Sequence, residues 1–272
     1  MLPLTITRLT SDSPFTPAEL VLQDIAHERI PGHLYKYRDT GENTKKIFTQ
    51  SKLYFAKPHQ FNDPFDCQLT IDTTCTKAEL MHFIKRNNSH FSRAEGRRMV
   101  EKYMDNPSLL RTVVNEAARE SLGRTGICCF GPNNHSLLMW AHYSDSHRGL
   151  CLKFDVAADP DAFVFPFKVK YRDNYPRLNH IRAPEGASVR EMVTTKSKDW
   201  EYENEYRVMK FQDAGLHSFK KAALVGVTFG CKASDAFIKE IKTLAADNGF
   251  EHLTFDKAYP SQAKFAVSIR PI

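Results

Sequence analysis

The chain has 272 residues, a net charge of +6, 42% apolar residues and 11% aromatic residues. This composition is ample for a hydrophobic core and predicts an ordinary globular protein. No run of about 18 apolar residues occurs, and the N-terminal residues lack the basic-then-apolar order of a secretory signal, so we expect no membrane span and a cytoplasmic location.

The cysteines and the basic residues indicate which metal sites and which binding partners to expect. The six cysteines are scattered and form no C-x-x-C pair, so we predict reduced thiols and no zinc site of the common spacing. The Lys and Arg residues are compatible with a polyanionic partner, but they are spread along the chain and are more typical of a solvated surface.

The N-terminal third is predicted to contain one helix and two short strands. About ten residues of disordered or loosely docked chain come first. Thr16-Pro17-Ala18-Glu19 then has the order of a capping box, which predicts a helix over residues 17–28. Short aromatic runs at 34–38 and 52–56 are typical of strands. Asn62-Asp63-Pro64 then indicates a capped turn, with Phe61 and Phe65 as its anchors in the core.

Residues 76–123 are predicted to form a helical insertion. Three helix starts follow one another, at Thr76 with Glu79, Ser92 with Glu95, and Asn106 with Pro107. Each is followed by an apolar stripe at helical spacing, and Gly123 is the expected end.

The second half is predicted to consist mainly of strands. Strands are expected at 126–131, 149–155, 164–172, 201–210, 224–230, 251–256 and 264–270, and helices at 136–145, 187–197 and 234–248. Pro166 places the strand at 164–172 at an edge or a bulge. The sum is an α+β fold with about eight strands, in a single domain over residues 1–272.

Charged residues are concentrated in the segment Trp200 to Lys210. If residues 201–210 are extended, Glu203, Glu205 and Arg207 lie on one face of the strand. Two carboxylates in neighbouring positions repel each other, which raises the proton affinity of one of them, and Arg207 is the nearest compensating charge. The three side chains form either a functional site or a structural ion-pair network on an exposed or edge strand.

Common catalytic signatures are absent from the sequence. It contains no G-x-G-x-x-G, no P-loop, no H-E-x-x-H and no G-x-S-x-G. His135, His142 and His147 have no accompanying cysteine or carboxylate pattern, so no metal site is predicted.

Five blocks in order carry a resemblance to a known family. They are YKYR at 35–38, LYFAKPHQFNDPFD at 53–66, MWAHYSDSHRGLCLKFD at 139–155, VKYRDNYPR at 169–177 and WEYENEYRV at 200–208. In these blocks the chain resembles the bacterial family catalogued as domain of unknown function 2971, over roughly residues 34–211. That family implies no established activity.

The arrangement of the blocks resembles, more weakly, the ADP-ribosyltransferase fold. This resemblance implies a split, mostly antiparallel sheet core, here with the three-helix insertion, and a cleft that holds NAD as substrate. Arg38 or Tyr35 would contact the dinucleotide, Tyr54 would lie beside the nicotinamide, and Glu205 or Glu203 would be the catalytic carboxylate, with Glu205 the first choice. Arg207 would orient the carboxylates.

Two functions follow as hypotheses. The first is an NAD-dependent ADP-ribosyltransferase or NAD glycohydrolase that acts on a protein or nucleic acid, in phage defence or as a toxin. A carboxylate fixed beside the ribose would stabilise the positive charge that develops when the nicotinamide bond breaks. The second is a non-catalytic module that binds nucleic acid or protein through a basic surface. The first hypothesis predicts that Tyr35, Arg38, Tyr54, Glu203 and Glu205 meet in one cleft.

Overall fold

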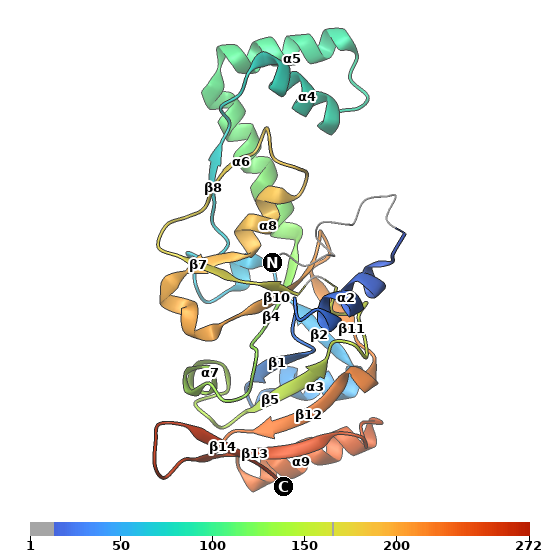
Figure 1. Cartoon of the computed structure of the whole chain (residues 1–272), viewed down its shortest axis with the longest axis vertical. Coiled ribbons are helices and arrows are strands. Elements are labelled where there is room, and N and C mark those ends of the chain that lie inside the picture. Colours follow the sequence, from blue (N-terminus) through green and yellow to red (C-terminus); the bar gives the residue numbers. More distant parts are fainter. Residues whose placement is uncertain (1–13, 165) are drawn as a thin grey trace.

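The computed structural model describes residues 14–164 and 166–272, and the predicted N-terminal lead lies outside these residues. Within them the chain is a mixed α/β protein with several, mostly antiparallel sheets, as predicted. The molecule is elongated (Figure 1). The helices α4 and α5 form one end, small sheets fill the middle, and the largest sheet with the C-terminus forms the other end.

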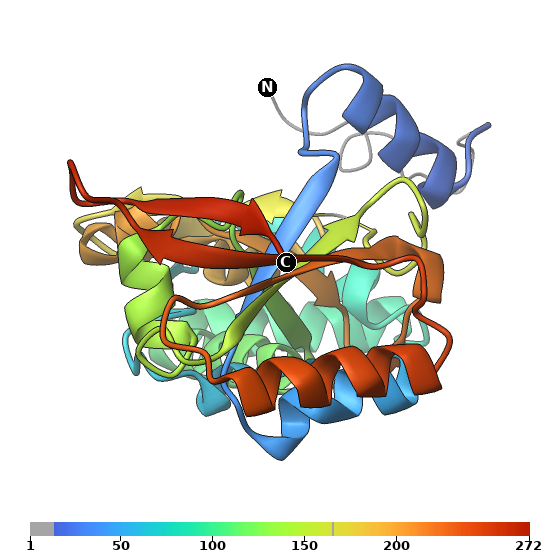
Figure 2. The same cartoon turned by 90° about the horizontal axis from the view of Figure 1, so that it is seen from below.

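The largest sheet has five strands in the order β1-β5-β12-β13-β14. Their bounds are His33–Arg38, Leu150–Asp155, Leu224–Phe229, Thr254–Pro260 and Val267–Pro271. Only β12 and β13 pair in parallel, and the other neighbours are antiparallel. The helices α3 (Glu42–Gln50) and α9 (Asp235–Asp247) lie side by side below this sheet (Figure 2). The main apolar core forms between them, around fully buried residues such as Phe48 and Phe154.

A second sheet meets the first near β1. It consists of β4 (Gly126–Phe130), β10 (Tyr206–Lys210) and β6 (Phe167–Lys168), all antiparallel. The backbones of Tyr35 and Gly131 exchange two hydrogen bonds, of 3.0 and 2.7 Å, and this single bridge connects β1 to the end of β4. A two-stranded sheet of β2 (Lys52–Phe55) and β11 (Gly215–Ser218) lies beside β4.

The predicted helical insertion is confirmed. It consists of α4 (Lys77–Asn87), α5 (Arg93–Asp105) and α6 (Pro107–Arg124). The capping boxes at the first two starts are formed as the sequence predicts, and α6 ends one residue beyond Gly123. The three helices bury a small apolar cluster together with Ile181, because none of them can cover its apolar stripe alone.

The helices predicted at 17–28, 136–145 and 234–248 and the first two strands, β1 and β2, are confirmed in position. The helix predicted at 17–28 is α2 (Pro17–Ala26), which begins with the expected capping box, and the helix at 136–145 is α7 (Leu137–Tyr143). Short 3₁₀ turns lie at Pro58–Gln60 and Lys221–Ala223.

Several short strands escape prediction from the sequence. The segment 164–172 divides into β6 and β7 (Lys170–Arg172), and the helix expected over 187–197 is α8 (Ala187–Val193) followed by β9 (Thr195–Ser197). In addition, β3 (Thr70–Asp72) pairs with β8 (Arg177–Asn179). Strands of two or three residues are too short to show a period, so only their tertiary partners define them.

The prediction of a continuous strand over 201–210 is wrong. Residues Lys198–Glu203 form a 3₁₀ turn, which begins where the Ser197 hydroxyl accepts a hydrogen bond from the Asp199 amide. Asn204 follows in the left-handed region with φ 45°, a conformation that asparagine tolerates better than most residues. The strand β10 therefore begins only at Tyr206, so neither Glu203 nor Glu205 lies on the strand that carries Arg207.

Among the described residues, none of the helices combines the length and the apolar character that crossing a bilayer requires.

Gly149, which leads into β5, is predicted to be intolerant of any side chain. A Cβ there would lie 2.1 Å from the carbonyl oxygen of Arg38, whereas a Cβ at Gly123 in α6 would meet nothing within 4 Å. We expect Gly149→Ala to lower the free energy of unfolding by about 1–3 kcal/mol, because backbone must move to make room. Gly123→Ala should leave stability unchanged or raise it slightly. Urea denaturation measures both, and equal effects would contradict the prediction.

Candidate functional site

A cavity of about 520 Å³ lies between β1, the segment 60–66, α7 and the segment 196–207. Four of the five sequence blocks, all except VKYRDNYPR, contribute residues to its lining. Aromatic side chains and a group of buried charges line it together. The charged group consists of Asp66, Lys196, Glu203, Glu205 and Arg207, which we call the buried charge cluster.

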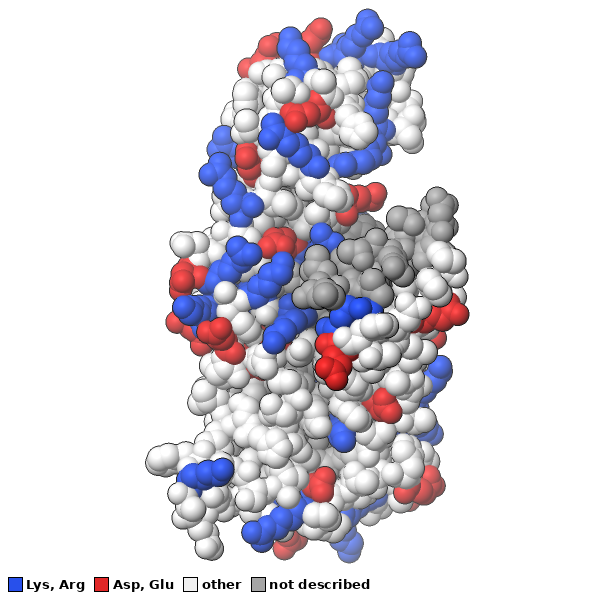
Figure 3. Space-filling view, in the orientation of Figure 1, with Lys and Arg blue, Asp and Glu red and all other residues white. Residues whose placement is uncertain are grey.

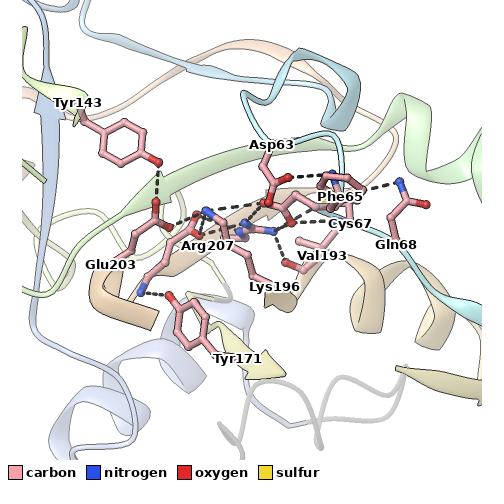
Figure 4. Close-up of polar contacts among 12 residues, drawn as sticks. Asp63, Phe65, Cys67, Gln68, Tyr143, Tyr171, Val193, Lys196, Glu203 and Arg207 are labelled. Carbon is pink, nitrogen blue, oxygen red and sulfur yellow. Dashed lines mark hydrogen bonds and ion pairs between the residues drawn. The ribbon is translucent and has the colours of Figure 1, made fainter. Parts of the chain in front are cut away.

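Arg207 on β10 is the centre of the buried charge cluster (Figure 4). Its side chain is 0% exposed. Its guanidinium donates to both carboxylate oxygens of Glu205, at 2.9 and 3.0 Å, and to both of Asp66, at 3.0 and 2.5 Å. A fifth bond of 2.8 Å reaches the carbonyl oxygen of Val193. All five N–H donors of the side chain are therefore used inside the protein.

Lys196 is the second buried cation, with its side chain 5% exposed. Its ammonium donates to Glu203 at 2.6 Å, lies 3.5 Å from Glu205 and lies over the ring of Trp200 at 4.7 Å. The cluster thus holds three carboxylates against two cations. With all its groups ionised it has a net charge of −1, which disfavours ionisation of the least compensated carboxylate.

The two glutamates have opposite environments. Burial acts to raise the pKa of Glu205, but Arg207 and Lys196 outweigh it and lower that pKa to about 2. Burial and the neighbouring charge of Glu205 instead raise the pKa of Glu203, against the opposing effect of Lys196. Such a divergence separates a carboxylate that stays ionised from one that takes up a proton more readily.

Tyrosines hold both glutamates in place. The Tyr143 hydroxyl, from α7, donates to Glu203 at 2.5 Å (Figure 4). Burial and Glu203 raise the pKa of Tyr143, so it remains a donor. The backbone amide of Glu205 donates to the Tyr171 hydroxyl at 2.8 Å. One carboxylate oxygen of Glu203 thus accepts from Tyr143, which lies outside the buried charge cluster, and the other accepts from Lys196.

The FNDPFD block supplies the third carboxylate. The Asp63 side chain accepts from the Phe65 amide at 2.9 Å, which forms the capped turn that the sequence predicts. Asp66 follows the turn, accepts from the Cys67 amide at 2.7 Å and faces Arg207. Of the two predicted anchors, Phe65 is instead 67% exposed, because the turn directs Asp66 rather than Phe65 inward.

The structure brings together most of the residues that the sequence singles out. Tyr35, Arg38, Glu203, Glu205 and Arg207 all line the cavity. Tyr54 does not. It is 49% exposed on β2, donates to Gln60 at 3.0 Å and lines a neighbouring groove.

Three members of the site were missed from the sequence: Asp66, Tyr143 and Lys196. Asp66 and Tyr143 lie in two of the five sequence blocks, at 53–66 and 139–155, so membership of these blocks could have indicated them. Lys196 lies in none of the five blocks, and only the folded chain places it beside Glu203.

The histidines and cysteines give no metal centre. His142 lines the cavity and packs against Tyr202, while His147 stacks on Trp140. Within residues 14–164 and 166–272, no group of three or more His, Cys, Asp or Glu residues is arranged to hold a metal ion. All six cysteines are free thiols.

The fold and the cavity define a mixed α/β protein whose sheets meet at a buried cluster of carboxylates and cations. Residues 139–208 match the family model described as Protein of unknown function (DUF2971), which confirms the resemblance to that family over this segment; the blocks at 35–38 and 53–66 lie outside it. The matched segment includes Tyr143, Lys196, Glu203, Glu205 and Arg207. No curated protein and no solved structure matches the chain.

Arg207 is predicted to be indispensable for stability. Arg207→Lys leaves Asp66 and Glu205 buried with fewer donors, so we expect a loss of about 3–5 kcal/mol in the free energy of unfolding. Arg182→Lys is the matched control, because Arg182 forms an exposed ion pair with Glu79 and should cost about 1 kcal/mol or less. Chemical denaturation of both variants tests this, and similar small losses would contradict it.

The low pKa of Glu205 predicts a loss of stability in acid. Because this pKa is lower in the folded chain than in the unfolded chain, its contribution is present above about pH 4.5 and disappears as the pH falls toward about 2. Glu205→Gln should therefore be less stable than the wild type at pH 7, and the difference should shrink by about 3 kcal/mol over that range.

Urea denaturation at a series of pH values measures the difference, with exposed Glu116→Gln as control. A difference between wild type and Glu205→Gln that does not change with pH would contradict the assignment.

Proposed function

We propose that the cavity binds NAD and cleaves its nicotinamide–ribose bond, transferring ADP-ribose to a protein or nucleic-acid acceptor or to water. The observation that carries the proposal is the pairing, in one cavity of about 520 Å³, of aromatic side chains with a buried charge cluster of net charge −1. Cavities of this size suit small-molecule ligands.

The charge of the cluster suits the bond that would break. As the bond between the ribose C1′ and the nicotinamide nitrogen lengthens, its electron pair leaves with the neutral nicotinamide and positive charge develops on the ribose. A buried, preoriented anionic group lowers the energy of that charge more than water would. A proton from the attacking water or acceptor group must then be taken up, which requires a base.

Glu203 is the better candidate for this base, which reverses the order of the two glutamates expected from the sequence. Both oxygens of Glu205 are bound by Arg207, and its pKa of about 2 makes it a weak base. Glu203 has a raised pKa, so its ionised form accepts a proton more readily. In this proposal Glu205 contributes fixed negative charge, and Arg207 and Lys196 orient the two carboxylates.

Other lining residues provide groups for the rest of the ligand. Tyr35 and His142 offer rings for the nicotinamide. Lys36 and Arg38 lie at the boundary with the neighbouring groove, where cations can pair with a pyrophosphate. An enzyme of this kind that depletes NAD or modifies a target in the cytoplasm would suit a toxin or a phage-defence protein.

A second candidate, a non-catalytic binding module, is favoured by one observation. Residues 77–124 carry ten Lys and Arg against six Asp and Glu, a net charge of +4 out of the +6 of the whole chain. Basic side chains are prominent at the end of the molecule formed by α4 and α5 (Figure 3). In this alternative the buried charge cluster only holds the fold together.

Release of nicotinamide from NAD by the purified protein tests the proposal. Glu203→Gln should reduce the rate at least 100-fold, because the variant keeps the shape of the side chain but loses the base. The wild-type rate should rise with pH through the raised pKa of Glu203.

Glu201→Gln is the matched control, since Glu201 lies on the same 3₁₀ turn but is exposed. This variant should keep the wild-type rate. Absence of NAD turnover with protein, DNA and RNA acceptors alike would favour the binding module, and equal rates for Glu201→Gln and Glu203→Gln would remove Glu203 from the reaction.

A further inference from the structure

A groove of about 590 Å³ adjoins the cavity. The two share Lys36, Arg38, Gln60, Phe61 and Cys129 in their linings, so a ligand in the groove can reach the cavity without leaving the protein surface. The groove extends from this boundary along α3 and β2.

The groove has an unbalanced positive charge. Lys36, Arg38, Lys46 and Lys52 line it, and none of the described residues in its lining is Asp or Glu. Lys46 and Lys52 form no ion pair within the described part of the chain, whereas their neighbour Lys45 is bound by Glu42 and Glu240. Lys46 and Lys52, which have no ion-pair partner among the described residues, therefore line the groove.

The order of residues along α3 explains this arrangement. Asn43, Lys46, Ile47 and Gln50 all line the groove, and they are three or four residues apart, so they share one face of the helix. On the neighbouring face Phe48 packs fully buried in the main core. The core thus fixes the rotation of α3 and directs Lys46 outward into the groove.

An apolar platform completes the groove wall. Tyr54 on β2 and Leu216 on β11 are directly paired across the two strands, and they are 49% and 56% exposed. The hydrogen bond from the Tyr54 hydroxyl to Gln60 fixes the ring. A ring fixed on a rigid strand beside a row of cations is the arrangement that binds stacked bases and a phosphate backbone.

We infer that this groove binds single-stranded nucleic acid. The groove contains more cations than are needed to pair with one pyrophosphate. Lys36 and Arg38 at the shared boundary suffice for the proposed dinucleotide, while Lys46 and Lys52 lie farther along the groove. Their role is to hold the phosphates of a strand whose base stacks on Tyr54.

The strand would then be the acceptor for the proposed reaction, and this part of the inference rests on the proposed function. A nucleophilic oxygen or nitrogen of the strand forms a bond to the ribose C1′ as the bond to nicotinamide breaks. The proton of that nucleophile passes to Glu203. The binding itself does not depend on the reaction.

Fluorescence anisotropy with labelled twelve-residue DNA and RNA strands, on the full chain at low salt, tests the inference. The double variant Lys46→Glu/Lys52→Glu should weaken binding at least 10-fold and make it less dependent on salt, because two phosphate contacts are lost. Tyr54→Ala should weaken binding at least 5-fold through the loss of stacking. Thermal denaturation confirms that each variant is folded.

The double variant Arg97→Glu/Arg98→Glu is the matched control, since it makes the same change of charge at exposed positions on α5. It should bind within twofold of the wild type. The inference is overturned if the wild type binds neither strand, or if the α5 variant loses binding and the groove variant does not.

Titration of NAD distinguishes the groove from the proposed dinucleotide site. If the groove variant binds NAD more weakly but binds the strands normally, the groove belongs to the dinucleotide and the inference fails. Nicotinamide release in the absence of any strand is measured separately, so failure of strand binding and failure of the proposed function give different results.

Discussion

The structure depends on the five hydrogen bonds of one buried guanidinium. Arg207 is fully buried, and an unpaired charge at such a position would cost several kcal/mol. Its donors are satisfied by Asp66 from the segment after β2, by Glu205 from the residues before β10 and by the Val193 carbonyl at the end of α8. Segments far apart in the sequence are therefore held at fixed positions, and the cavity forms where they meet.

The same interaction sets the chemistry of the cavity. Arg207 is already neutralised by Asp66 and Glu205. The cation beside Glu203 is therefore Lys196, which Glu203 shares with Glu205, and Glu203 also lies next to the negative charge of Glu205. The protein thus presents one carboxylate that is firmly ionised and a second that can exchange a proton. The buried charge cluster thus combines a structural ion-pair network with a proposed reactive group. Substitution of Glu203 separates these two roles by experiment.

The division of the sheets determines what can reach this cluster. Within the described residues, a single backbone bridge between Tyr35 and Gly131 connects the large sheet to the end of β4, and both of these residues line the cavity. Residues on the same face of β1 have different surroundings along the strand. Leu34 is buried in the main core, whereas Lys36 and Arg38 line both the cavity and the groove. The helices α4 and α5 lie away from this region, at one end of the molecule, whereas α6 reaches down to the segment that carries Asp66 (Figure 1).

Local signals in the sequence predict the elements whose formation depends on a few neighbouring residues. The capping boxes at Thr16, Thr76 and Ser92 fixed the helix starts, and the aromatic runs fixed β1 and β2, because these signals act within a few residues. The sequence also indicated Glu203, Glu205 and Arg207, although it placed them on one strand, and the left-handed Asn204 excludes that. Only the tertiary structure decided the partners: Asp66 and Tyr143 are 141 and 60 residues away from Arg207 and Glu203. Contacts over such distances leave no periodic trace in the chain, so the buried charge cluster is visible only once the sheets have assembled around it.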